Sequence, residues 1–267
     1  MAAYPEVGEA VIWLVTGAGG VCEDDETWWS RLSEEDRERL NRRRAVQRAA
    51  TKMRRYAVRN KLVRLLTLTY RCVVCDGDPC TCGQRLGPAE RSRVKRDVNR
   101  LMVAMRDSLG VEALPYLYVI ERGGKRTKRL HIHLLVGSEV DVEALGELRR
   151  DGRGEEYRTG GVWVHGRVHV REPSGAGLRD RARSGARYLA KYVDKALGDE
   201  DEAWAHSYER SQGFNVRQVG RHGLLRLGDA VEVVAMVLGV AVADLEWSWS
   251  DDWEDWFGPP TAAVRLA

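Results

Sequence analysis

The stretch RLHIHLLVG, residues 129–137, places two histidines two positions apart in a run of leucine, isoleucine and valine. Side chains alternate across a β-strand, so His131 and His133 lie on the same face. The preceding LPYLYVIE, residues 114–121, has the composition of a second strand. The polar segment between the two runs, RGGKRTK, contains two glycines. We therefore predict an antiparallel hairpin.

A carboxylate faces these histidines if the hairpin turns at Arg126. Glu121 then lies directly opposite His131 and diagonally from His133. Two imidazoles and one carboxylate suit Mn²⁺ or Mg²⁺ and also accommodate Zn²⁺ or Co²⁺. A register shift of one residue would turn Glu121 to the other face. The alternative is that one histidine is hydrogen-bonded in the core and the other partly solvated. The facing glutamate favours the metal site.

Two tyrosines follow in RYLAKYVDK, residues 187–195, which we predict to be helical. Tyr188 and Tyr192 are four residues apart, as are Lys191 and Lys195, so the pairs share a neighbourhood on the helix. A phenol is a poor nucleophile at neutral pH unless its anion is stabilised, and an ammonium or a metal-polarised phosphate gives such help. The alternative is an amphipathic helix whose tyrosines pack while its lysines extend into solvent.

Four cysteines lie within CVVCDGDPCTC, residues 72–82. Thiolates this close together can surround one tetrahedral Zn²⁺, and clustered cysteines inside cells are more often metal ligands than disulfides. A redox or incidental cluster is the alternative. We predict a structural zinc site formed by Cys72, Cys75, Cys80 and Cys82.

Charge is segregated along the 267-residue chain, although its net charge is only +3. Arg37–Arg64 carries twelve Lys or Arg against one Glu, whereas Asp244–Asp255 has acidic and no basic residues. A basic block on a helix-forming background is a plausible footprint for a phosphate backbone, and a solvated helix face is the alternative. The candidate DNA-binding side chains are Arg42, Arg43, Arg44, Arg54 and Arg55.

No membrane segment is expected. The longest apolar run, Val231–Val242, is interrupted by Glu232 and is too short to cross a bilayer. The N-terminus lacks the basic start of a secretory signal, so we expect a cytoplasmic location.

The predicted elements alternate along the chain as helix, strand, helix, strand, strand, helix, strand and helix. This order favours an α+β fold with a largely antiparallel sheet. The helices are expected at 26–64, 87–110, 141–152 and 185–198, and the strands at 65–70, 114–121, 129–137 and 160–173. The expected domains are a basic helical extension at 1–60, a central domain at 61–215 with the zinc loop at 72–82, and a helical appendage with an acidic, Trp-rich tail at 216–267.

The motifs LLTLTY, an acidic residue before HIHLLV, RYLAKYVDK and YERSQGF occur in this order. The series resembles the HUH-endonuclease superfamily, specifically the rolling-circle replication initiators of plasmids and small single-stranded DNA phages. The resemblance covers about residues 60–215, and its two-tyrosine form is similar to that of microvirus-type initiators. It implies a palm-like antiparallel sheet of about five strands, with the two histidines on a central strand, flanked by helices. The zinc loop is an addition to this pattern.

The resemblance also implies a chemistry and assigns roles to residues. A divalent metal, Mn²⁺ or Mg²⁺, would be bound by His131, His133 and Glu121. Tyr192 and Tyr188 match the nucleophile positions, with Lys191 and Lys195 as their basic partners. One tyrosine would attack a phosphodiester of single-stranded DNA, which gives a 5′-phosphotyrosyl link and a free 3′-hydroxyl that primes replication.

The expected function is therefore that of a rolling-circle replication initiator that nicks and rejoins single-stranded or hairpin origin DNA. A P-loop motif is absent from the sequence, so we expect a host helicase to unwind the DNA and a host polymerase to copy it. A relaxase or transposase of the same chemistry is one alternative. A zinc-containing DNA-binding regulator without catalytic activity is another, and metal-dependent nicking separates it from the enzymes.

Overall fold

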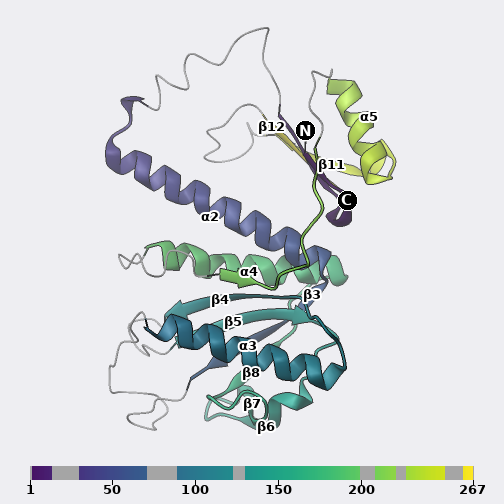
Figure 1. The fold of residues 1–267 in the computed structure, drawn as a ribbon. Coiled ribbons are helices and arrows are strands. Elements are labelled where there is room, and N and C mark those ends of the chain that lie inside the picture. The colour runs from purple at the N-terminus through teal and green to yellow at the C-terminus, as the bar shows by residue number, and fades with distance from the viewer. Residues whose placement is uncertain are drawn as a thin grey trace. The chain divides into compact units, whose positions relative to one another are not determined.

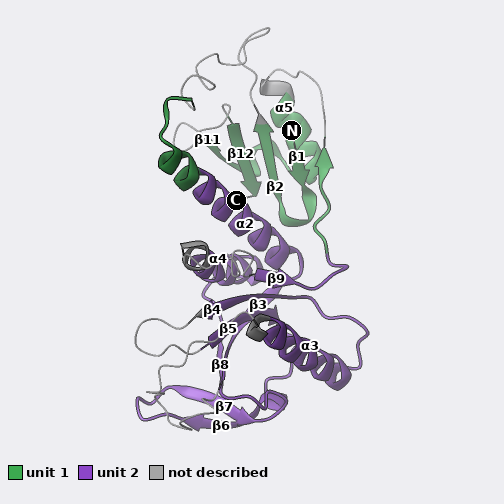
Figure 2. Ribbon diagram, turned by 60° about the vertical axis from the view of Figure 1, so that its left-hand side comes forward, with its two compact units in different colours: residues 1–40, 215–267 green, residues 41–214 purple. Residues whose placement is uncertain are grey.

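The computed structural model describes residues 2–13, 30–70, 89–122, 130–198, 208–220, 227–249 and 261–266. The fold is α+β, with helices packed on antiparallel sheets (Figure 1). The chain divides into two compact units (Figure 2). One unit contains residues 41–214, and the other contains the two chain ends, 1–40 and 215–267. None of the described helices is long and apolar enough to span a membrane.

The larger unit is built on a seven-stranded antiparallel sheet with the order β6-β7-β8-β3-β5-β4-β9. The antiparallel sheet was expected, but the β6–β7 hairpin makes it wider than the predicted five strands. The strands are β3 (Leu62–Thr69), β4 (Tyr116–Arg122), β5 (Leu130–Gly137), β6 (Gly146–Arg150), β7 (Glu156–Gly160), β8 (Val168–Arg171) and β9 (Tyr208–Arg210).

The strand that carries the two histidines, β5, lies inside this sheet between β3 and β4. Glu121 of β4 pairs with His131 of β5, so the predicted hairpin and its register are confirmed. On the other side of β5, Thr67 of β3 pairs with His133. Because paired residues share a face, the register places Glu121, Thr67 and both histidines on one side of the sheet.

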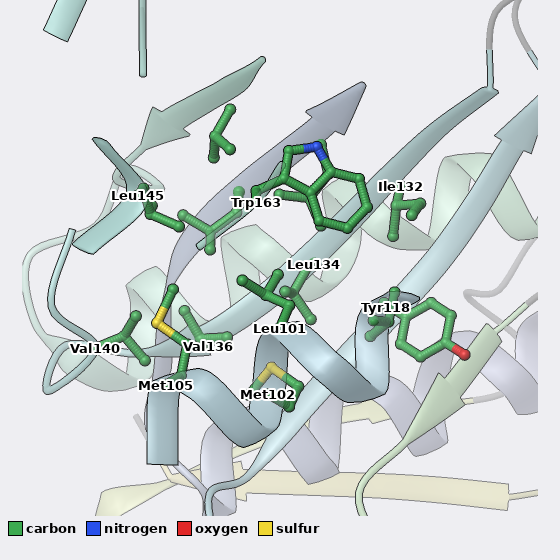
Figure 3. Close-up of a cluster of buried hydrophobic side chains, with 14 of the residues drawn as sticks. Leu101, Met102, Met105, Tyr118, Ile132, Leu134, Val136, Val140, Leu145 and Trp163 are labelled. Carbon is green, nitrogen blue, oxygen red and sulfur yellow. The ribbon is translucent and has the colours of Figure 1, made fainter. Parts of the chain in front are cut away.

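The opposite side of the sheet is covered by helix α3 (Ala89–Leu109), which ends before Gly110 in a left-handed conformation (φ 65°). Its apolar side chains repeat at helical spacing and pack on the alternate residues of β5. Trp163 completes this core, and its indole Nε1 donates to the carbonyl oxygen of Thr69 at 3.0 Å. Figure 3 shows the packing of Leu101, Met102, Met105, Ile132, Leu134, Val136 and Trp163.

Helix α4 (Leu178–Gly198) packs on β3, β4 and β5 from the histidine side of the sheet (Figure 1). Gly185 is the point of close approach. A Cβ atom on Gly185 would lie 2.7 Å from Cδ1 of Leu135 and 3.1 Å from Cγ of Pro173. Because the helix has no side chain here, its next turns lie directly over the sheet.

The basic helix predicted at 26–64 is observed as α2 (Glu34–Arg59). Its N-terminus is capped by Ser33, whose Oγ accepts from the backbone N–H of Asp36 at 3.0 Å. Three acidic residues in the first turn favour the same end through the helix dipole. In its last turns, the Tyr56 hydroxyl lies 2.6 Å from Oγ of Ser211, which connects the helix to the chain after β9.

The helix predicted at 141–152 does not form. A short 3₁₀ turn (Glu143–Leu145) is followed directly by strand β6. Gly146 adopts a φ of 105°, and a Cβ at this position would collide with the backbone of Thr159 and Gly161. The apolar and charged spacing of this segment resembled a helix, but the close pairing of β6 with β7 determines the backbone.

The smaller unit is a second antiparallel sheet, with the order β10-β1-β2-β12-β11. The two chain ends, which we expected to be helical, contribute strands that pair with each other over a long sequence separation. Helix α5 (Leu227–Leu238) packs on this sheet around Val234, which is fully buried. The strands are β1 (Ala2–Tyr4), β2 (Glu9–Trp13), β10 (Val219–Gly220), β11 (Leu245–Trp249) and β12 (Thr261–Leu266).

Candidate active site

His133 is the centre of the polar group on the α4 side of the sheet. It is 3% exposed, and protein atoms contact both of its ring nitrogens. Nε2 lies 2.9 Å from Oε2 of Glu121, and Nδ1 lies 3.2 Å from Oγ1 of Thr67. The carboxylate accepts only, so Nε2–H donates to Glu121, and the Thr67 hydroxyl donates to Nδ1 when the ring is neutral. The ring is thus fixed in orientation from both sides.

The two tyrosines of α4 lie against this histidine. The Tyr192 ring stacks on the His133 ring, with centroids 4.0 Å apart and planes 18° apart. The Tyr188 ring meets the same imidazole edge-on at 5.7 Å. The Tyr192 hydroxyl donates to the Tyr188 hydroxyl at 2.7 Å. The helix therefore brings two phenol oxygens together beside the Glu121–His133 pair.

The environment of Tyr192 favours its neutral form. Burial raises the pKa of Tyr192 above the ordinary tyrosine value, and the hydrogen bond that it donates to Tyr188 raises it further. The nearby charge of Glu121 acts in the same direction, whereas the charge of Arg171 lowers the pKa. Arg171 belongs to β8, where it pairs with Leu65. It is the one cation here whose charge is found to favour the tyrosinate among the described side chains.

Two of the three predicted metal ligands are in contact. In the described part of the chain, no three His, Cys, Asp or Glu side chains cluster closely enough to hold a metal ion. The His131 ring lies on the same face, with its centroid 6.4 Å from that of His133. Adjacent ligands of an octahedral metal with bonds of about 2.1 Å are about 3.0 Å apart. The 2.9 Å separation of His133 Nε2 and Glu121 Oε2 therefore fits two neighbouring ligands of one such metal.

The predicted basic partners of the tyrosines are placed less closely. Lys191 is exposed to solvent, and it lies about 100° around the helix from Tyr192. The side chain of Lys195 and all four cysteines at 72–82 lie outside the described residues. The candidate DNA-binding arginines all belong to α2, where Arg42 and Arg43 are exposed and Arg44, Arg54 and Arg55 are half-buried.

Two residues at the site were not predicted from the sequence. Thr67 lies in LLTLTY, which indicated only a strand, and its position beside His133 depends on the pairing of β3 with β5. The alternating threonines of that run were the one available signal. Arg171 had no signal, because its proximity to Tyr192 depends on the pairing of β8 with β3.

Residues 63–197 match the model of the replication-associated protein family of the ORF2 type. The chain belongs to this family. Membership agrees with the resemblance to rolling-circle initiators, and it implies binding to DNA. The matched region of this replication-associated protein begins in β3 and ends in α4, so it includes the histidines and both tyrosines. No curated protein and no solved structure matches the chain.

Proposed function

We propose that this replication-associated protein initiates rolling-circle replication by nicking and rejoining single-stranded origin DNA at Tyr188 and Tyr192. The observation that carries the proposal is the packing of both phenols on His133, which is hydrogen-bonded to Glu121. A protein that only bound DNA would have no need of two nucleophiles beside a histidine–carboxylate pair. The family match supports a role in replication.

The proposed step is a transesterification at phosphorus. The Tyr192 oxygen attacks the scissile phosphate, the bond from phosphorus to the 3′-oxygen breaks, and a 5′-phosphotyrosyl ester forms. The phenol loses its proton and the departing 3′-oxygen takes one up, so the exchange is balanced. The ester conserves the energy of the broken bond, and a free 3′-hydroxyl or the second tyrosine can therefore reverse the transfer.

The residues have distinct tasks in this step. Tyr188 accepts the hydrogen bond of the Tyr192 hydroxyl at 2.7 Å and is positioned to act as the second nucleophile. Arg171 favours the tyrosinate by its charge. Glu121 and His133, with His131 beside them, would hold a divalent metal. Such a metal, when bound, withdraws charge from a non-bridging phosphate oxygen. A host helicase and polymerase would act on the strand after nicking.

A covalent-adduct assay tests the proposal. Labelled single-stranded DNA from the element's own predicted origin is incubated with the full-length protein and Mn²⁺ or EDTA, and the products are separated on a denaturing protein gel. We expect a metal-dependent protein–DNA band that is lost in the Tyr188→Phe/Tyr192→Phe double variant. Tyr70→Phe is the matched control, because Tyr70 donates to Asp97 on the α3 side of the sheet.

The single variants and the absence of an adduct separate the remaining possibilities. If Tyr188→Phe leaves nicking, joining and repeated turnover unchanged, the tyrosines do not alternate. Binding of origin DNA without an adduct in either condition would contradict the nuclease proposal and favour a DNA-binding regulator of replication.

A further inference from the structure

The histidine side of the sheet continues beyond the tyrosines onto β8 and β7. Thr67 of β3 pairs with His133 on one side and with His169 of β8 on the other, so the three side chains form one row across the sheet. Arg171, two residues further along β8, therefore lies on the same face. Arg167, two residues before His169, shares it as well.

Tyr157 of β7 extends this row of side chains. Its ring lies under the guanidinium of Arg167, whose Cζ is 4.3 Å from the ring centroid. The ring centroid is also 6.0 Å from that of His169. We call Tyr157, Arg167, His169 and Arg171 the β7–β8 strip. It joins three basic side chains and one aromatic ring on a continuous surface.

The β7–β8 strip is accessible beside the tyrosine helix. Helix α4 packs mainly over β3, β4 and β5, and Figures 1 and 2 show β7 and β8 toward the end of the sheet away from it. Arg171 is exposed, and the other three side chains are half-buried. Neighbouring strands are about 4.8 Å apart, so β8 lies about 10 Å and β7 about 14 Å from β5 along the face.

The charge of the strip is positive. Among the described residues, no carboxylate forms an ion pair with Arg171. The carboxylate of Asp151 interacts with the charges of Arg167 and His169, but its Oδ1 already accepts the backbone N–H groups of Arg153 and Glu155 at 2.8 and 3.0 Å. His169 is held by a contact of 3.1 Å between its Nδ1 and the carbonyl oxygen of Glu156.

We infer that the β7–β8 strip binds the single-stranded DNA that flanks the scissile phosphate, with a base on the Tyr157–Arg167 pair and the backbone along Arg167 and Arg171. The inference rests on the proposed function, since it assigns a flanking site to the same substrate. Proteins that bind single strands combine a cationic path along the backbone with aromatic rings for base stacking. A duplex keeps its bases stacked inside and leaves the Tyr157 ring without a partner, so the surface favours a single strand.

The pairing of Arg167 with Tyr157 supports this inference. A guanidinium held over a ring has lost part of its side-chain freedom before any ligand arrives, so less entropy is lost when DNA binds. Arg and Tyr also each present a flat face on which any base can stack. The expected binding is therefore independent of sequence, whereas the choice of the scissile site lies elsewhere.

The test compares strands that do and do not reach the strip. Binding of the full-length protein in EDTA is measured by fluorescence anisotropy, with an oligonucleotide that ends close to the scissile phosphate and with versions extended on the 5′ or the 3′ side. We expect one extended strand to bind more tightly to the wild type. Tyr157→Leu should weaken that binding on the order of ten-fold. Arg167→Gln should lower the slope of log affinity against log salt by about 0.7 for a lost phosphate contact.

Control variants separate this effect from a general loss of charge or of folding. Arg96→Gln removes an exposed charge from α3, on the other side of the sheet, and should leave the advantage of the extended strand intact. Tyr157→Phe keeps the ring and should bind like the wild type. Thermal unfolding of each variant shows whether the β6–β7 hairpin is preserved.

The strip and the nuclease proposal fail in different ways. If the wild type forms the covalent adduct but Tyr157→Leu and Arg167→Gln bind the extended strands as tightly as Arg96→Gln, the strip is not a DNA site and the nuclease proposal stands. If no adduct forms with Mn²⁺, the nuclease proposal fails. Equal binding of short and extended strands by the wild type also overturns the strip.

Discussion

Replacing Thr67 by valine tests whether the orientation of His133 matters for metal binding. Valine keeps the β-branched shape that suits a strand and removes only the hydroxyl. The Thr67 hydroxyl is 3.2 Å from Nδ1 of His133, and it can donate to that nitrogen or accept from it. It therefore supports the ring when Nε2–H donates to Glu121, and also when the proton has moved to Nδ1 and Nε2 is free to bind a metal.

The size of the effect follows from burial. His133 is 3% exposed, so without Thr67 its Nδ1 would have lost a partner that water cannot replace. A buried polar group left without a partner costs about 1–3 kcal/mol. For a domain of this size, each kcal/mol lowers Tm by about 2–4 °C. The metal affinity should fall further, by about 10–100-fold, because the hydrogen bond to the far nitrogen orients a ligating histidine.

Two measurements on Thr67→Val and Thr67→Ser check this prediction. Mn²⁺ affinity is measured by calorimetric titration, and Tm by thermal unfolding in EDTA. Serine keeps the hydroxyl, so Thr67→Ser should retain Mn²⁺ affinity even if the lost methyl group lowers Tm. If Thr67→Val binds Mn²⁺ and forms the DNA adduct like the wild type, the hydroxyl has no part in orienting His133, and the assignment of this histidine as a ligand loses its structural support.

Three further predictions concern packing, pH and the unplaced cysteines. Gly185→Val should destabilise the protein by about 1–3 kcal/mol and reduce adduct yield, because its side chain overlaps Leu135 and displaces α4; denaturant unfolding and the adduct gel check both. Burial raises the pKa of Tyr56, so the folded state keeps this proton while the unfolded chain loses it near pH 10. Stability should therefore be complete below about pH 10 and fall above it, and the advantage of about 1 kcal/mol over Tyr56→Phe should shrink with rising pH in unfolding curves. Elemental analysis should find Zn²⁺ in the purified protein and lose it when the cysteines at 72–82 are changed to serine.

The part of the site that could be predicted is the part formed by neighbours in sequence. The polar segment at 122–128 and the alternation along β5 were sufficient to place Glu121 opposite His131, because a short hairpin fixes its own register. The spacing of Tyr188 and Tyr192 was likewise sufficient to place both phenols on one face of α4. Local periodicity decides both cases.

Long-range pairing decided what local periodicity could not. The β6 segment has the spacing of an amphipathic helix, yet its pairing with β7 and the tight approach at Gly146 impose a strand. The chain ends gave no sign of each other, although β2 and β12 pair along five residue positions. Thr67 and Arg171 became visible only once β3 had been placed between β5 and β8.

The source of positive charge at the tyrosines illustrates the same point with a consequence for mechanism. Sequence spacing favoured Lys191, but a helix that lays Tyr188 and Tyr192 on the sheet turns position 191 toward solvent. The strand side of the site supplies Arg171 instead, and its charge opposes the rise in the Tyr192 pKa caused by burial. A guanidinium keeps its charge at any pH at which the protein is folded, whereas an exposed ammonium is screened by water and salt. The tyrosinate is therefore favoured by the strand that also carries the β7–β8 strip, so one segment of chain would both bind the flanking DNA and activate the nucleophile.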